Sequence, residues 1–239
     1  MCTTEDLTVT SPPLAVIFDA DGVIFDSEKF SLQAFCETAA EFGPPLDDDQ
    51  IAENCGQTDA AIVDQLSRQF GTHIEYEAFR KRKFARYCEL VEQATLEVFP
   101  GVMELLETLR EREIPHAVAS SGSPTKIEFN MTKTGLAEEF SVIVSGEELG
   151  TSKPDPAVFL HTAEILEMPP NRCLVIEDSI NGVAAAKAAG MPVAAVTNTF
   201  HRHQLRQADL IVDSLEELTF VKIHDLVLRP HVQEALARD

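Results

Sequence analysis

The stretch Leu14-Ala15-Val16-Ile17-Phe18-Asp19-Ala20-Asp21-Gly22 decides the fold. Its first five residues are apolar without alternation, which is typical of a strand buried on both faces of a parallel sheet. The strand ends at Asp19 and Asp21, and open α/β sheets bind their ligands at the carboxyl ends of the strands. The sequence therefore predicts an α/β fold with two carboxylates at its ligand-binding edge.

Five further apolar runs follow along the chain, at residues 116–119, 142–144, 173–176, 193–196 and 210–212. Helix signals lie between them. Ser123-Pro124 places an N-cap before a proline at the first helical position, and Gly135 can end that helix. Asp155-Pro156 repeats the arrangement, and Ser179 precedes an alanine-rich helix that Gly190 ends. This alternation predicts a doubly wound, Rossmann-like parallel sheet.

One interval breaks the alternation of strands and helices. Between Ser27 and Leu96 no run is typical of a buried strand, and apolar residues recur at helical spacing. These sets are Leu32, Phe35, Cys36 and Ala39, then Ile62, Leu66 and Phe70, then Phe79, Phe84, Tyr87 and Val91. We therefore predict a helical domain over residues 27–96, inserted into an α/β core domain of residues 14–26 and 97–239.

Composition limits the classes of partner and the compartment. The 239 residues include 19 Lys and Arg against 40 Asp and Glu, a formal net charge of -21. This charge repels nucleic-acid backbones and anionic membrane surfaces, so we expect neither as a partner. The five cysteines are scattered without a C-x-x-C pair, which indicates reduced, buried thiols and neither a disulfide framework nor a zinc site. The sequence shows no signal-peptide pattern and no long apolar run, so we predict a cytoplasmic protein. We expect it to be a monomer or a weak homodimer.

Acidic residues follow two of the predicted strands. Asp19 has an ordinary pKa near ~3.9, so it would be ionised at neutral pH and able to attack phosphorus. Asp21 could protonate a leaving oxygen and later activate water. Glu177 and Asp178, at the end of the fourth run, could complete an oxygen-ligand site for Mg²⁺. Each acidic pair also has a structural alternative, because Asp is common in turns and carboxylates are favourable at helix N-termini.

Two polar sites complement the acidic residues. Ser120, Ser121 and Gly122 lie between the second run and a helix, where a hydroxyl and backbone amides form a phosphate cradle; a serine-rich cap is the alternative. Lys153 precedes another helix, although most lysines are simply solvated. Three aspartates and a phosphate dianion bring together about five negative charges, and each like-charge contact costs on the order of 4 kcal/mol at ~4 Å. Such a site requires a divalent cation and a fixed lysine.

The four motifs Asp19-Ala20-Asp21-Gly22, Ser120, Lys153-Pro154 and Glu177-Asp178 together resemble those of the haloacid dehalogenase superfamily of phosphotransferases. The resemblance extends from Leu14 to about Leu218, and the helical insertion is similar to the family's cap domain. It implies that Asp19 is the nucleophile that forms an aspartyl-phosphate and that Asp21 is the general acid and base. It implies further that Ser120 and Lys153 hold the phosphoryl group, and that Asp19, the Asp21 carbonyl and Asp178 bind Mg²⁺ with Glu177 nearby.

Within the superfamily, the chain most resembles the β-phosphoglucomutase and sugar-phosphatase subgroup, through Asp26-Ser27-Glu28 and the basic stretch 80–83 with Tyr87. This resemblance implies that Lys83 contacts a substrate anion, with a solvated basic helix face as the alternative. The mutases carry a cap histidine where this chain has Ser31, and a cap arginine that Gly56-Gln57-Thr58-Asp59 lacks. We therefore predict a phosphatase that acts on a small phosphorylated metabolite such as a sugar phosphate.

Three other functions remain open. A mutase of the same fold would isomerise the sugar phosphate instead of releasing phosphate. A phospho-accepting receiver also combines Mg²⁺, an aspartate, a hydroxyl group and a lysine. Receivers, however, are about half this length, have no helical insertion and place the acceptor on the third strand. A non-catalytic binding protein is the third alternative, which the presence of all four motifs disfavours.

Overall fold

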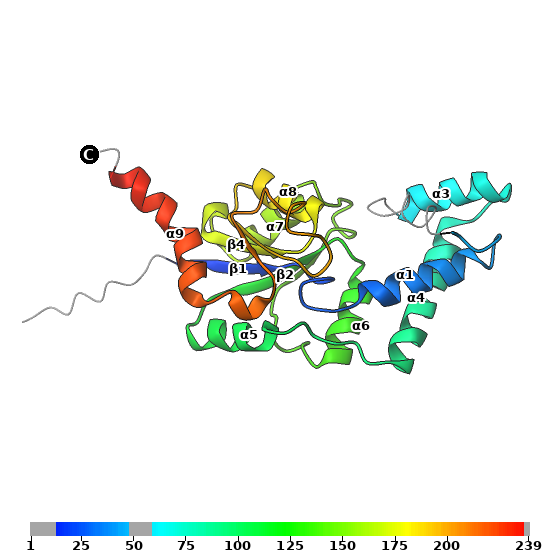
Figure 1. Cartoon of the computed structure of the whole chain (residues 1–239), viewed down its shortest axis with the longest axis horizontal. Helices are drawn as coiled ribbons and strands as arrows, with labels where there is room; N and C mark the ends of the chain where they lie inside the picture. Colours follow the sequence, from blue (N-terminus) through cyan, green and yellow to red (C-terminus); the bar gives the residue numbers. More distant parts are fainter. Residues whose placement is uncertain (1–12, 48–58, 237–239) are drawn as a thin grey trace, which may run out of the picture. The chain divides into compact units, whose positions relative to one another are not determined.

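The structure, a computed structural model, describes residues 13–47 and 59–236. Backbone contacts divide the chain into two compact units. One unit contains the described residues up to Ile24 and from Val98 onward, and the other contains Phe25–Glu97. The first unit is built around a sheet and the second is helical (Figure 1).

A six-stranded sheet with the order β3-β2-β1-β4-β5-β6 forms the centre of the first unit. All of its strand pairs are parallel. The strands are β1 (Ala15–Phe18), β2 (His116–Ser120), β3 (Ile143–Ser145), β4 (Cys173–Glu177), β5 (Val193–Val196) and β6 (Leu210–Val212). All six predicted runs are thus confirmed as strands. The strand order reverses between β1 and β4, and this switch point is where doubly wound sheets bind ligands.

Helices cover both faces of this sheet, with α7 and α8 on one side and α5 on the other (Figure 1). The helices of the first unit are α5 (Val102–Glu111), α6 (Pro124–Thr134), α7 (Ala157–Ile165), α8 (Ile180–Ala188) and α9 (Phe220–Leu236), with short 3₁₀ turns at Pro170–Arg172 and Leu215–Glu217. The predicted boundaries of α6 and α8 are confirmed. The Ser123 side chain accepts a hydrogen bond from the Lys126 amide, and Gly135 ends α6 at φ 75°. Ser179 caps α8 in the same way.

The predicted start of α7 is wrong by one residue. Pro156 is its N-cap and the helix begins at Ala157. The Asp155 carboxylate nevertheless accepts a hydrogen bond from the Ala157 amide at 2.8 Å. An N-cap side chain accepts from an amide two or three residues ahead, so Asp155 makes the capping contact expected of it although the helix starts one residue later.

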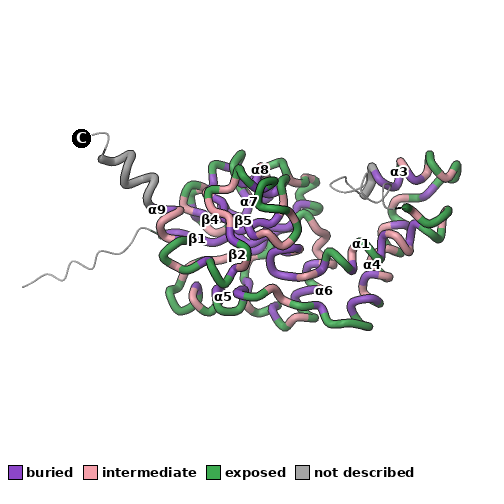
Figure 2. Tube along the Cα trace, in the orientation of Figure 1, coloured by how far each residue is buried: buried purple, intermediate pink, exposed green. Residues whose placement is uncertain are grey.

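The strands form the core of the first unit. Every residue of β1, β4 and β5 is buried (Figure 2). Phe18 packs edge-to-face on Phe140, with 5.7 Å between ring centroids. Burying a large apolar side chain contributes about 1.5–3 kcal/mol. The continuous burial of β1 therefore fixes the position from which Asp19 emerges.

The described residues of the second unit form α1 (Glu28–Ala39), α3 (Asp59–Phe70) and α4 (Tyr76–Gln93). Its core gathers predicted residues from all three helices, including Phe35, Leu66 and Phe79. Leu32 is an exception, since it is 46% exposed. It lies two residues before Ala34, and two residues on a helix correspond to about 200°, so Leu32 falls on the face opposite the buried one.

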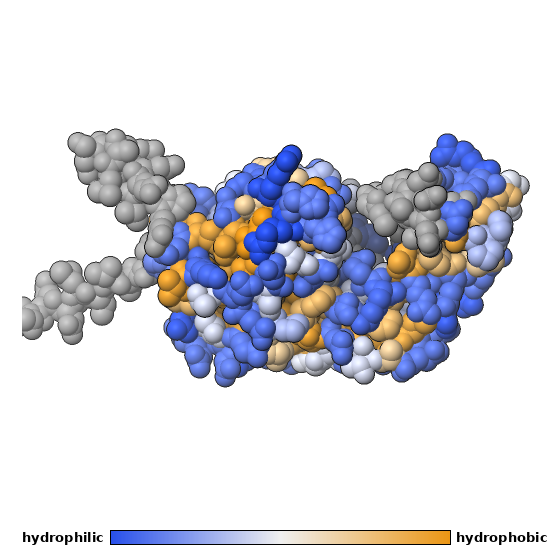
Figure 3. Space-filling model, viewed as in Figure 1, coloured by the Kyte–Doolittle hydropathy of each residue, from blue (hydrophilic) through white to orange (hydrophobic). Residues whose placement is uncertain are grey.

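The face shown in Figure 3 carries both hydrophilic and hydrophobic areas, with the hydrophilic ones more extensive. No helix in residues 13–47 and 59–236 is both long and apolar enough to cross a membrane. Cys36, Cys88 and Cys173 are free thiols, but only Cys173 is buried as predicted, whereas Cys36 and Cys88 are half-buried. Cys2 and Cys55 lie outside the described residues.

Candidate active site

Asp19 lies at the carboxyl end of β1, beside the switch point of the sheet. Its amide donates to the Ile176 carbonyl at 2.9 Å, which extends the pairing of β1 with β4 by one residue. The residue is only 8% exposed. Burial raises the pKa of Asp19 to about 7, against the opposing attraction of Lys153 and with the help of the Glu177 charge. The expectation that Asp19 is fully ionised at neutral pH is therefore wrong for the metal-free protein, because burial at the ligand-binding edge opposes its ionisation.

Lys153 is the buried cation of this site, with a side chain that is 6% exposed. Its ammonium donates to the Asp19 carboxylate, to Glu177 Oε1 at 2.7 Å and to the Ala119 carbonyl at 3.1 Å. The group lies 4.7 Å from the centroid of the Phe159 ring. Burial alone would lower the pKa of Lys153, but the charges of Asp19 and Glu177 outweigh it and raise this pKa. The lysine therefore stays charged at neutral pH.

Glu177 is fully buried and anchors two elements. Its Oε1 accepts from Lys153, while Oε2 accepts from the Asp178 amide, the Ser179 amide and the Ser179 hydroxyl, each at 2.9 Å. A carboxylate is also favourable at the N-terminus of a helix, here α8. Both oxygens of Glu177 therefore accept hydrogen bonds within the protein. We expect this residue to lie near a bound metal ion without being one of its direct ligands.

The Glu177 carboxylate occupies the space beside Gly182 on α8. A methyl group on Gly182 would lie 1.7 Å from Oε1 and 1.8 Å from the carboxyl carbon. Gly182→Ala gains about 1 kcal/mol in helix propensity. We nevertheless expect it to destabilise the protein by about 1–3 kcal/mol and to reduce activity, because the overpacked carboxylate must move. Urea unfolding and turnover measure the two effects. In a Glu177→Asp background, which shortens this side chain, the cost should shrink; an equal cost would contradict the steric explanation.

Asp178 is the second buried aspartate of the site and is 4% exposed. The Thr199 hydroxyl donates a hydrogen bond to its carboxylate. Burial raises the pKa of Asp178 well above its ordinary value, and the charges of Glu177 and Asp19 add to the rise. Asp19 and Asp178 are therefore close enough to repel each other, and a cation between them would relieve that repulsion.

The loop after β1 and the loop after β5 meet at Asp178. Gly22 has a φ of 82°, and a methyl group there would lie 2.0 Å from Asp178 Oδ2 and 2.9 Å from the Thr199 hydroxyl. The Asn198 side-chain amide donates to the Gly22 carbonyl at 2.8 Å. Gly22 thus satisfies two requirements: it accepts a left-handed backbone, and it leaves room for the Asp178 carboxylate.

The residues present fit Mg²⁺. This ion takes oxygen ligands and is commonly held by one or two carboxylates, with water completing the shell. Asp19 and Asp178 supply two carboxylates whose pKa values are raised mainly by burial, with the Glu177 charge adding to both rises, and the Asp21 carbonyl is the third expected ligand. Across the described residues, no group of three or more His, Cys, Asp or Glu side chains could hold a metal ion. The proposed Mg²⁺ site has only two such side chains, Asp19 and Asp178, because its third ligand is a backbone carbonyl.

The predicted phosphate cradle lies beside these carboxylates. Ser120 is 2% exposed, and its hydroxyl accepts a hydrogen bond from the Gly122 amide at 3.0 Å. The Ser121 hydroxyl accepts from the Lys153 amide at 3.5 Å. A methyl group on Gly122 would lie 3.3 Å from the Ser120 hydroxyl and 3.7 Å from Asp21 Oδ2. The loop therefore brings Ser120, Ser121 and Gly122 between Lys153 and Asp21.

Lys126 reaches Asp21 from α6, with its Nζ 2.9 Å from Asp21 Oδ2. The sequence analysis did not identify Lys126, Asn198 or Thr199. The last two lie after β5 and meet the site only through the sheet topology. Lys126 had one local signal: it is a lysine in the first turn of a predicted helix that begins at the site.

Lys83 lies in the second unit, half-buried on α4, as does Ser31 on α1. Residues 56–58, which decide the predicted absence of a cap arginine, lie outside the described residues.

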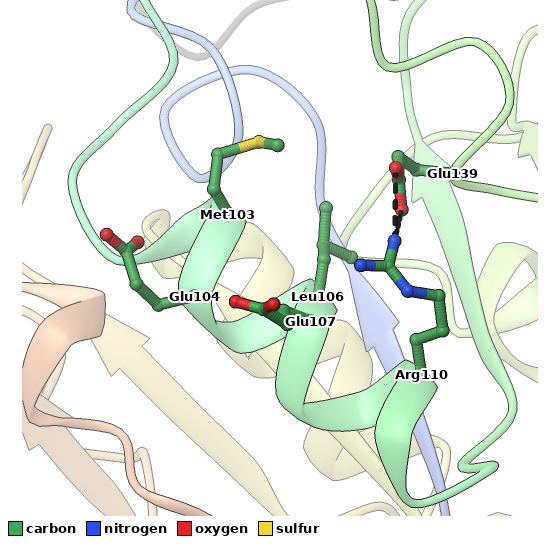
Figure 4. Close-up of a pocket in the computed structure, with 6 residues that line it drawn as sticks. All are labelled: Met103, Glu104, Leu106, Glu107, Arg110 and Glu139. Carbon is green, nitrogen blue, oxygen red and sulfur yellow. Dashed lines mark hydrogen bonds and ion pairs between the residues drawn. The ribbon is translucent and has the colours of Figure 1, made fainter.

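A separate hollow on α5 is lined by Met103, Glu104, Leu106, Glu107, Arg110 and Glu139 (Figure 4). Its arginine is paired with a glutamate at 3.1 Å, and its other charged residues are acidic. This hollow is therefore a poor phosphate site, and it contains none of the predicted site residues.

The comparison with known families agrees with this geometry. Residues 16–196 match the family described as haloacid dehalogenase-like hydrolase. The chain belongs to this hydrolase family. The match begins within β1 and ends with β5, so it includes Asp19, Lys153 and Asp178.

Individual relatives carry phosphatase and mutase names. The chain is 32% identical to hexitol phosphatase B of Escherichia coli over 210 residues, 86% of this chain and 94% of that protein. It is 30% identical to β-phosphoglucomutase of Bacillus subtilis over 229 residues, 93% of this chain and 99% of that protein. The structure of CbbY from Rhodobacter sphaeroides in complex with phosphate has a TM-score of 0.79 at 27% identity, covering 90% of this chain and 100% of that one. The chain spans only 19% of the length of another relative, from Arabidopsis thaliana, to which it is 33% identical.

Proposed function

We propose that the protein is a Mg²⁺-dependent phosphatase that hydrolyses a small phosphorylated metabolite, such as a sugar phosphate, through an aspartyl-phosphate on Asp19. One observation carries this proposal: a buried ammonium, Lys153, joins Asp19 to Glu177 beside the Ser120 loop at the switch point of the sheet. An ordinary buried ion pair needs neither an adjacent second aspartate nor an adjacent helix N-terminus. A site for a phosphoryl group needs both a cation and backbone donors.

Two proton-balanced steps follow from the side chains. A carboxylate oxygen of Asp19 attacks phosphorus, the bond to the leaving oxygen breaks, and Asp21 donates its proton to the leaving alcohol. Asp21, now ionised, takes a proton from a water molecule that attacks the same phosphorus. The bond to Asp19 then breaks, which releases phosphate and restores both aspartates.

The other residues of the site hold the phosphoryl group. Lys153 supplies a fixed positive charge to its oxygens, and Ser120, Ser121 and Gly122 supply a hydroxyl and backbone amides. Glu177 positions Lys153. Mg²⁺, when bound by Asp19, Asp178 and the Asp21 carbonyl, would neutralise part of the negative charge that these carboxylates and the phosphate bring together.

The helical unit is proposed to select the substrate. Active-site lids exclude bulk water and favour the substrate that completes them. Lys83 is the residue of this unit that we propose as a contact to the substrate anion. The names of the E. coli hexitol phosphatase and the B. subtilis phosphoglucomutase support a phosphorylated sugar or sugar alcohol as the substrate class.

A mutase is the second candidate, and the 30% identity to β-phosphoglucomutase favours it. A mutase must bind a bisphosphate in two orientations and protect the aspartyl-phosphate from water. Ser31 replaces the histidine that the mutases carry, which favours hydrolysis.

The two candidates are separated by their products. We would incubate the protein with Mg²⁺ and a panel of hexose, pentose and hexitol phosphates that includes β-glucose 1-phosphate. Free phosphate and the product sugar are measured together, with Asp19→Asn as the control. Release that requires both Mg²⁺ and Asp19 would support the phosphatase. Conversion of β-glucose 1-phosphate into glucose 6-phosphate without release would instead identify a mutase.

A further inference from the structure

Lys126 occupies a position that α6 itself disfavours. Ser123 is the N-cap and Pro124 the first helical residue, so Lys126 lies in the first turn of the helix. A cation there opposes the helix dipole at a cost of about 0.3–1 kcal/mol. No acidic residue of α6 offsets the charge in that turn. Local helix stability therefore does not explain this lysine.

The contact of Lys126 with Asp21 offers an explanation. Its ammonium lies 2.9 Å from Asp21 Oδ2, and the two side chains are 19% and 18% exposed. The same Oδ2 faces Gly122, because a methyl group on that glycine would be 3.7 Å from it. Lys126 thus fixes one oxygen of Asp21, and this oxygen lies beside the cradle loop. An ion pair with this little exposure is more constrained than one on the open surface.

We propose that Lys126 is a positioning residue for general acid catalysis by Asp21, a role that rests on the function proposed above. Lys126 holds Oδ2, so that the proton is exchanged at Oδ1. When Asp21 donates its proton to the leaving alcohol, negative charge develops on its carboxylate. The ammonium stabilises that charge while the proton moves to the leaving alcohol. No proton leaves Lys126 in either step.

The dependence of the rate on the leaving group isolates this role. An alkyl phosphate releases a strongly basic alkoxide and requires protonation, whereas p-nitrophenyl phosphate releases a weakly basic phenolate and does not. Lys126→Met keeps the length of the side chain and removes its charge. We expect it to lower kcat for an alkyl phosphate by about 10–100-fold, within the usual contribution of general acid catalysis, and to leave KM nearly unchanged. Its turnover of p-nitrophenyl phosphate should stay close to that of the wild type.

Three controls accompany this variant. Lys126→Arg, which keeps a cation, should recover most of the lost kcat. Lys133→Met removes an exposed lysine at the other end of α6 and should leave the turnover of both substrates unchanged. In an Asp21→Asn background, Lys126→Met should add nothing, because the group that it positions is gone.

The outcomes separate this inference from the proposed function. An equal loss on both substrates, or a higher KM with unchanged kcat, would overturn the positioning role, since it would indicate structural damage or a direct substrate contact. Unchanged kinetics would overturn it as well. Wild-type turnover that survives Asp19→Asn would overturn the proposed function itself, whatever Lys126→Met does.

Discussion

Asp19→Asn is expected to lose at least about 10³-fold in kcat on every phosphate ester, because an amide oxygen cannot form the aspartyl-phosphate. The fold should persist. Asp19 is a buried carboxylate whose desolvation opposes ionisation, so a neutral group of the same shape removes an unfavourable charge from the core. Phosphate release and thermal unfolding of the variant measure both effects. Turnover within tenfold of the wild type, or an unfolded variant, would contradict this expectation.

The stability of this variant should also depend on pH in a defined direction. Burial raises the pKa of Asp19 from 3.8 to about 7, so between these values the folded wild type keeps a proton that the unfolded chain has lost. The free energy of unfolding of the metal-free wild type therefore falls as pH rises through this window. Asp19→Asn lacks this group, so its stability relative to the wild type should increase from about pH 4 to about pH 7. A difference that stays flat over this window would show that Asp19 titrates normally.

Lys153→Met is expected to damage both activity and stability. The variant leaves Asp19 and Glu177 buried without their shared counter-charge, and removing one partner of a buried ion pair costs about 3–5 kcal/mol. Activity should fall by at least about 10³-fold, since the phosphoryl group also loses its fixed cation. Urea unfolding followed by circular dichroism, together with phosphate release, measures the two losses.

A double-mutant cycle identifies the source of the lost stability. If the cost arises from unpaired carboxylates, then Lys153→Met should cost less in an Asp19→Asn background, where Glu177 alone is left without its cation. Lys187→Met is the matched control, because Lys187 forms an exposed ion pair with Asp209 at 2.7 Å, a contact worth about 0–1 kcal/mol. A similar cost for Lys153→Met in both backgrounds would mean that the core is stabilised by packing of the aliphatic part of the Lys153 side chain, and not by its ammonium charge.

The fold could be predicted because its signals are local. Each strand is a short apolar run bounded by turn residues, and caps such as Ser123 and Ser179 act within three residues of their own position. The error at Pro156 and the exposed Leu32 show the limit of local rules. At Pro156 the helix starts one residue later than the cap pattern predicts, and the exposure of Leu32 depends on which helix face the neighbouring helices cover.

The candidate site was only partly accessible from sequence. Asp19, Asp178, Ser120 and Lys153 follow strand ends or precede helices, so topology alone predicts their meeting. The two oxygens of Glu177, its conflict with Gly182 and the contact of Lys126 with Asp21 depend on side-chain directions between segments far apart in the chain. The Lys126 contact joins residues 105 positions apart. No local pattern encodes such a pairing.

The most direct test of the central claim is to trap phosphate on Asp19. Asp21→Asn should still be phosphorylated by p-nitrophenyl phosphate, which needs no general acid, but should lose the base that activates water. We would quench this variant in acid during turnover, reduce the acyl phosphate with borohydride and locate the modified residue by mass spectrometry. We predict a burst of about one p-nitrophenol per chain and modification at Asp19, as a covalent intermediate requires. Steady release without a burst and without modification at Asp19, or modification at another residue, would contradict the account.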